Sequence, residues 1–123
     1  MTPFTRTTTR GLGTVIATRT LQTEASEVVV RLGAPRPMAA EPRDWECPWR
    51  VDGLEDGPVE RCAFGIDALQ ALILALTQIG DQLTHHRLPV TFLGFPELGV
   101  PTTNPVVLGS SCATATIRHR VAA

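Results

Sequence analysis

The chain has 123 residues with 11 basic and 12 acidic side chains, so it is close to neutral, and this excludes several classes of protein. A chain of this length can bury a core that folds without disulfides or metal, and it fits a single domain. The balanced charge gives no electrostatic field that favours nucleic acid or an anionic membrane surface. We therefore expect a single-domain protein that binds neither nucleic acid nor membranes.

The cysteines and the chain start indicate the compartment. Cys47, Cys62 and Cys112 are an odd number without Cys-x-x-Cys spacing, which is typical of neither a disulfide framework nor a zinc site. The threonine-rich head, residues 1–13, is not followed by an apolar segment, so it is not a secretory signal. No stretch approaches the roughly 18 apolar residues of a membrane span. We expect a cytoplasmic protein with no metal and no cofactor.

The first half of the chain predicts two paired strands and a loop. β-Branched residues favour strands over 14–21 and 27–33, and the short turn between them favours antiparallel pairing. Three prolines then fall between residues 34 and 43, where their missing donors forbid regular pairing. This segment is predicted to be a loop.

A second hairpin is predicted from strands over 45–52 and 59–66. Pro48 cannot donate to a ladder, so the first of these strands lies at an edge or turns that position away from its neighbour. If both apolar faces point at one core, odd residues of the first strand oppose even residues of the second, which brings Cys47 close to Cys62. Two reduced core cysteines are the simpler interpretation, and a regulatory disulfide is the alternative. The apolar positions are Trp45, Cys47, Trp49 and Val51 in the first strand and Cys62, Phe64 and Ile66 in the second.

A long helix over residues 67–86 is the clearest element. Asp67 is placed to cap it, and Gln70 three residues later completes a pair that resembles a capping box. Apolar residues at steps of three and four predict the face that covers the sheet. That face comprises Leu69, Leu72, Ile73, Leu76, Ile79 and Leu83, while Gln70, Thr77, Gln78, Asp81 and Gln82 lie opposite with Leu74 among them.

The expected fold is α+β, with an antiparallel sheet of four to five strands and the helix packed on one face. The fifth strand is a candidate over residues 89–95, which follow two histidines that suit the negative end of the helix. Three regions result: a flexible head (1–13), one α+β domain (14–101) and a tail (102–123) with a candidate added strand.

Four segments together resemble a family of small, uncharacterised bacterial proteins catalogued as a domain of unknown function. The most specific are Trp-x-Cys-Pro-Trp at 45–49 and Gly-Ile-Asp-Ala-Leu-Gln-Ala-Leu at 65–72, and the resemblance extends over residues 16–101. The family implies no activity, cofactor or catalytic residue. The head and the tail after Pro101 lie outside the resemblance.

The sequence contains no recognisable set of catalytic residues, so it favours a non-catalytic protein over an enzyme. Residues 109–112, Gly-Ser-Ser-Cys, lack the Gly-x-Ser-x-Gly spacing of an exposed nucleophile. Acidic residues gather around the second hairpin, where a solvated charged surface is the simpler interpretation and binding of a cation or a basic partner the alternative. They are Asp44, Glu46, Asp52, Glu55, Asp56 and Glu60.

The leading functional hypothesis is a protein-interaction module whose partner is a second copy or another protein. Its contact surface is the outer helix face with Gln70, Leu74 and Gln78, together with Trp45 or Trp49 where a ring is exposed. An immunity-like role, neutralising a toxin by contact, is one concrete form. The alternative is a small-molecule-binding protein or an unrecognised enzyme, with a pocket between sheet and helix near Trp45, Trp49, Cys62 and Phe64.

Overall fold

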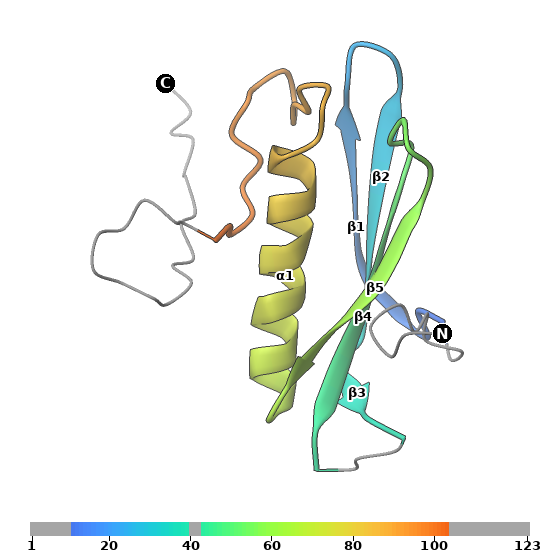
Figure 1. The fold of residues 1–123 in the computed structure, drawn as a ribbon, viewed down its shortest axis with the longest axis vertical. Helices are drawn as coiled ribbons and strands as arrows, with labels where there is room; N and C mark the ends of the chain where they lie inside the picture. Colours follow the sequence, from blue (N-terminus) through green and yellow to red (C-terminus); the bar gives the residue numbers. More distant parts are fainter. Residues whose placement is uncertain (1–10, 40–42, 104–123) are drawn as a thin grey trace, which may run out of the picture.

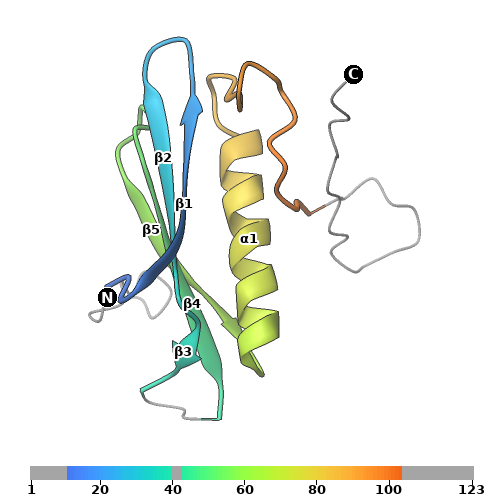
Figure 2. The same cartoon turned by 180° about the vertical axis from the view of Figure 1, so that it is seen from behind.

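A computed structural model of the chain describes residues 11–39 and 43–103 and confirms the expected α+β fold, with an antiparallel sheet covered on one face by a helix (Figures 1 and 2). The candidate strands of the tail beyond residue 103 lie outside the described residues. No helix among the described residues is long and apolar enough to cross a membrane. The elements are β1 (Val15–Gln22), β2 (Glu27–Gly33), β3 (Arg36–Pro37), β4 (Trp45–Asp52), β5 (Val59–Gly65) and α1 (Ala68–Thr84).

Strand β4 is the centre of the sheet. On one side it pairs with β5, and on the other it pairs with β2 through residues 49–52 and with β3 through residues 45–46. β1 pairs with β2 and forms the outer edge there. Both predicted antiparallel hairpins are therefore confirmed, and the fifth strand is the two-residue β3.

Pro48 lies in a central strand, in the gap between the residues that pair with β2 and those that pair with β3. Its missing N–H therefore interrupts neither ladder, which is the second of the two placements expected for it. The Pro48 ring is fully buried, and a Cβ on Gly33 would lie 2.7 Å from its Cγ atom. Glycine at position 33 thus allows β2 to end against the proline ring.

The predicted register of the β4–β5 hairpin is wrong by one residue. Odd residues pair with odd residues, and Cys47 lies opposite Ala63. Ala63 and Gly65 are buried, whereas Phe64 between them is 46% exposed. Because side chains alternate between the faces of a strand, Cys62 and Phe64 lie on the face away from the core, opposite to the expectation.

The start of α1 is confirmed and its end is two residues short of the expectation. The Gln70 N–H donates to Asp67 Oδ1 at 2.8 Å, and Gln70 Oε1 accepts from the Ile66 N–H at 2.8 Å. The first bond satisfies a backbone donor that the first turn leaves without a helical partner, and the second ties the residue before the cap to the helix. At the other end His85 is the cap, and its N–H donates to the Asp81 carbonyl.

The predicted buried face of α1 is only partly correct. Ile79 and Leu83 are buried, but Leu69 is 63% and Ile73 44% exposed. The helix lies over β4 and β5, where Ala71 and Ala75 are fully buried. The prediction from the sequence assumes that the large apolar side chains face the sheet, whereas the contact between α1 and the sheet requires small side chains.

The contact between α1 and β5 is close because both sides are small. A Cβ on Gly65 would lie 2.5 Å from the Ala71 backbone nitrogen, a distance that real Cβ atoms essentially never show. Ala63, also fully buried, lies on the same face of β5. The helix is therefore held against the β4–β5 half of the sheet.

Residues 89–95 do not form the candidate strand. Thr91 exchanges backbone hydrogen bonds of 2.8 and 2.9 Å with Gln22, and Phe92 and Phe95 close a tight turn. Leu93 and Gly94 inside the turn have φ values of 54° and 82°, which end an extended strand. The contact with β1 is thus a single bridge.

The segment that follows this turn returns along α1 (Figure 1). Leu98 is buried in the core, and a Cβ on Gly80 would lie 2.0 Å from the Pro101 carbonyl oxygen. The Thr103 N–H donates to Asp81 Oδ1 at 2.8 Å. Residues 98–103 therefore cover a second side of the helix.

The face assignment of β5 predicts unequal effects of two neighbouring substitutions. Gly65→Ala should lower the free energy of unfolding by about 1–3 kcal/mol, because the added methyl group forces α1 away from the sheet. Phe64→Ala should cost about 1 kcal/mol or less, since half-exposed side chains contribute little packing. Urea denaturation followed by circular dichroism measures both. A larger loss for Phe64→Ala than for Gly65→Ala would contradict the observed register.

Candidate functional site

An apolar cleft lies between the β1–β2 half of the sheet and α1. Its volume is about 270 Å³. The cleft exists because the helix is held over β4 and β5, which leaves part of the inner face of β1 and β2 uncovered. β1 contributes Ala17, Thr18, Arg19 and Leu21, β2 contributes Val30 and Leu32, α1 contributes Leu76, Ile79 and Leu83, and Gly99, Val100 and Pro101 border the remaining side.

The register of the sheet explains which side chains enter the cleft. Ala17, Arg19 and Leu21 of β1 pair with residues of β2 whose apolar side chains are buried in the core, so all three face the helix. Thr18 and Thr20 point to the other face. Ala17 is exposed, which leaves room at this part of the cleft.

Arg19 is the charged side chain of the cleft, and it is half-buried. Its Nη1 donates to the Leu98 carbonyl at 2.6 Å, and its guanidinium carbon lies 4.1 Å from the centre of the Phe92 ring. These contacts hold the side chain across the cleft. A guanidinium has five N–H donors, so this arrangement leaves donors for a further acceptor.

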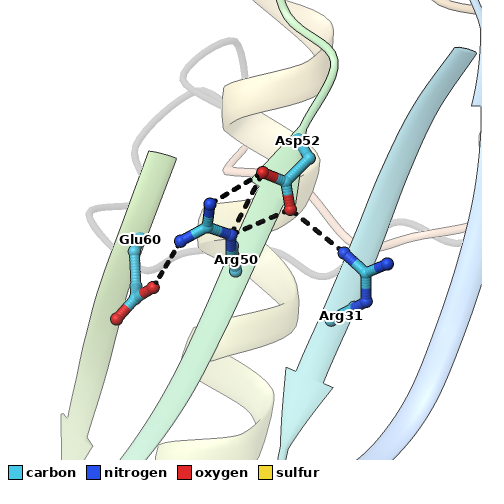
Figure 3. A network of polar contacts seen from close by, with 4 residues as sticks. All are labelled: Arg31, Arg50, Asp52 and Glu60. Atoms are coloured by element: carbon cyan, nitrogen blue, oxygen red, sulfur yellow. Dashed lines mark hydrogen bonds and ion pairs between the residues drawn. The ribbon is translucent and has the colours of Figure 1, made fainter. Parts of the chain in front are cut away.

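A second cluster of charges crosses β2, β4 and β5 on the sheet face away from α1 (Figure 3). Arg50 is bonded to both oxygens of Asp52 at 2.9 Å and to Glu60 Oε1 at 2.8 Å. Arg31 Nη1 reaches Asp52 Oδ2 at 3.0 Å. Because Arg31 and Arg50 are directly opposite each other, Asp52 offsets the repulsion between them. The network links three strands in one register.

Arginines also pair with two other acidic side chains of this region. Arg36 forms an ion pair of 2.7 Å with Glu46, and Arg87 pairs with Glu55. Within residues 11–39 and 43–103, no group of three or more His, Cys, Asp or Glu side chains is placed to hold a metal ion. The charged side chains on the sheet face away from α1 therefore form ion pairs with one another, and the cleft is the stronger candidate site.

Neither cysteine of the hairpin is part of a disulfide among the described residues. Burial, together with a smaller effect of the neighbouring Cys62, raises the pKa of the Cys47 thiol to about 11, although Arg36 acts in the opposite direction. The thiol donates to the Gly33 carbonyl at 3.4 Å. Since the thiolate is the reactive form, Cys47 is a weak nucleophile at neutral pH.

The structure places the residues predicted for binding on the other flank of the helix, away from the cleft. Trp49 is 1% exposed, and its indole N–H donates to Gln78 Oε1 at 2.8 Å. Both line an open hollow of about 310 Å³. Trp45 and Leu74 are half-buried against the core, and Gln70 is exposed with its side chain engaged in the helix cap. The structure brings Trp49 and Gln78 together, and the binding role of all five stays a prediction.

Sequence reasoning missed the cleft residues because they are distributed over distant parts of the chain. One signal was available: Arg19 is a charged residue on the strand face that otherwise carries Ala17 and Leu21. A charge at an inward position of an amphipathic strand indicates a special environment. The contribution of residues 99–101 had no comparable signal, since a proline- and glycine-rich loop predicts no contact partner.

The sequence profile of a family described as a domain of unknown function (DUF6968) matches residues 17–101. This is more than half of the chain, so the chain belongs to that family, and the resemblance is confirmed. Every residue that lines the cleft falls within the matched range. No curated protein and no solved structure matches the chain.

The ion network predicts how stability depends on pH. Hydrogen bonds from Arg50 hold the pKa of Asp52 below its usual value of 3.8. The stabilisation is therefore present above the unfolded-state pKa and is lost as the pH falls through the lower, folded-state pKa. Asp52→Asn should be less stable than the wild type at pH 7, and the difference should shrink below about pH 4.

Urea denaturation at pH 7, 4 and 2.5 measures this difference. Glu24→Gln, in the exposed turn between β1 and β2, is the matched control and should match the wild type at each pH. A deficit of Asp52→Asn that is equal at all three pH values would show that its cause is not the charge.

Proposed function

We propose that this member of the DUF6968 family is a non-catalytic protein that binds a small apolar molecule in the cleft between β1, β2 and α1. The cleft itself carries the proposal: four separate segments line a hollow of about 270 Å³. Ligand sites span roughly 300–1,000 Å³ and are lined mainly by apolar side chains. A volume just below this range favours a small ligand. This keeps the predicted pocket between sheet and helix but moves it to the opposite flank of α1.

The chemistry of the lining favours binding over catalysis. Arg19 is its one titratable side chain, and a guanidinium stays protonated in proteins, so it is a poor general acid or base. The other contributions are aliphatic side chains and backbone. Cys47 and Cys62 are not joined by a disulfide, as is typical of a reducing compartment, and this supports a location in the bacterial cytoplasm.

Filling the cleft should abolish binding. N-phenyl-1-naphthylamine is a neutral apolar probe whose fluorescence rises in apolar surroundings, and the wild type should bind it saturably. Ala17→Trp places a large side chain in the cleft and should weaken binding by at least about tenfold, equivalent to about 1.4 kcal/mol.

Thr20→Trp is the matched control, because Thr20 is exposed on the other face of the same strand. It should leave the affinity within about twofold of the wild type. Equal binding by Ala17→Trp and the wild type, or no saturable binding by the wild type, would refute the proposed site. Thermal unfolding of both variants checks that the fold persists.

A second candidate function, protein interaction, is favoured by an apolar flank at the start of α1. Ile66, Leu69 and Ile73 are 73%, 63% and 44% exposed. Leu69 and Ile73 are four residues apart in α1 and so lie on one side of the helix, and Ile66 directly precedes the Asp67 cap. Exposed apolar patches mark contact surfaces when they are contiguous.

The partner that this flank fits is a second copy of the chain. No charged residue occurs between Asp67 and Asp81, so two such flanks can meet around a two-fold axis without repulsion between like charges. This retains the interaction hypothesis and adds contact residues beside Leu74. A different protein, as in the immunity-like role, is the other outcome of the test.

Leu69→Glu should abolish self-association. Sedimentation velocity over a range of concentrations should show a dimer for the wild type and a monomer for this variant, because a buried carboxylate without a partner is costly. Leu93→Glu is the matched control, since Leu93 is 66% exposed and lies in the turn after α1. A wild type that is monomeric throughout, or a dimer that Leu69→Glu leaves intact, rules out this dimer surface.

A further inference from the structure

We infer that the cleft selects a small carboxylic acid with an apolar tail, whose carboxylate pairs with Arg19 while the tail lies against the aliphatic lining. This inference rests on the proposed function, because it names the chemical class of the ligand for the same cleft. It adds the requirement that the ligand carries a single negative charge, which pairs with Arg19.

The first support is the charge balance around Arg19. On the outer face of the sheet Arg31, Arg36 and Arg50 each form an ion pair with a carboxylate. Across the part of the chain that the structure describes, Arg19 forms none. Its hydrogen-bond acceptor is the neutral carbonyl of Leu98. A half-buried guanidinium of this kind attracts an anion, because a charge removed from water needs a partner.

The second support is the geometry of the guanidinium. The Phe92 ring lies 4.1 Å from its central carbon and one of its terminal nitrogens is bonded to Leu98, so its orientation is fixed before a ligand arrives. A fixed planar fork matches the two oxygens of a carboxylate. Little side-chain entropy remains to be lost on binding, which favours affinity.

The third support is the access to Arg19. Gly99 faces it, and a Cβ on that residue would lie only 3.4 Å from Arg19 Nη1. Gly99 also has a φ of +71°, a conformation that favours glycine. A side chain longer than that of alanine would add atoms beside the guanidinium. The glycine therefore leaves space beside the charge.

The fourth support is size. At the packing density of protein interiors, about 0.74, a hollow of about 270 Å³ holds a molecule of roughly 200 Å³. A medium-chain or monocyclic aromatic acid is of this order. The apolar lining from Val30, Leu32, Leu76 and Ile79 suits the hydrocarbon part of such an acid. One cation and a short apolar hollow together indicate a monoanion with a single tail.

Octanoate and octanamide test the inference, because they share one tail and differ in the charge of the head group. Isothermal titration of each into the wild-type chain should show at least about tenfold tighter binding of octanoate, the range expected for a hydrogen bond to a charged group. Arg19→Met should reduce the preference to about one and should leave octanamide binding within about threefold. Arg19→Lys, which keeps the charge but loses the fork, should retain part of the preference.

Arg61→Met is the matched control. Arg61 is an exposed arginine on β5, outside the cleft, and its removal should leave the preference unchanged. A loss of preference in Arg61→Met as large as in Arg19→Met would place the charge elsewhere and overturn the inference.

The outcomes separate this inference from the proposed function. Equal binding of octanoate and octanamide by the wild type overturns the inference but is consistent with the proposed function. Binding of N-phenyl-1-naphthylamine without binding of either octanoate or octanamide has the same meaning. If none of the three ligands binds, both are refuted. The wild-type comparison needs no variant, so it remains decisive if Arg19→Met fails to fold.

Discussion

The contact between α1 and β5 is the constraint on which the rest of the structure depends. Gly65 and Ala63 on the strand meet Ala71 and Ala75 on the helix, and the space at Gly65 excludes even a methyl group. Such a contact fixes the helix over one half of the sheet, since interiors are close-packed and do not deform continuously. The helix therefore does not cover all of the inner face of β1 and β2. The segment after the helix covers part of that face, and the cleft lies where neither of them covers it.

The two faces of the sheet use arginine in different ways. On the outer face Arg50 shares Asp52 with Arg31 and also binds Glu60, so the charges balance locally and tie three strands together. Exposed ion pairs are individually weak, but a network that spans strands specifies their register. On the inner face Arg19 has a carbonyl and an aromatic ring as neighbours. The same type of side chain therefore supports the fold on one face and lines the cleft, the proposed binding site, on the other.

The sequence was sufficient for elements that depend on local rules. The helix start followed from Asp67 and Gln70, and both hairpins followed from strand patterns separated by turns. The inward face of β5 was not predictable by the same reasoning, because the rule that large apolar side chains point inward fails where a helix approaches closely. Phe64 was assigned to the core, yet only Ala63 and Gly65 leave room there. The cleft was not predictable for a different reason. The hydrogen bond between Arg19 and Leu98 joins distant parts of the chain, and the local sequence pattern around either residue does not indicate such a contact.

The bridge between Gln22 and Thr91 has a consequence for how the chain folds. Both hairpins and the helix join neighbours in sequence, so they can form early at little cost in loop entropy. The bridge and the Arg19–Leu98 bond join residues 69 and 79 positions apart. Contacts of such separation slow folding and form only once the intervening chain is ordered. The cleft is therefore the last part of this molecule to be assembled and the first that local opening would dismantle.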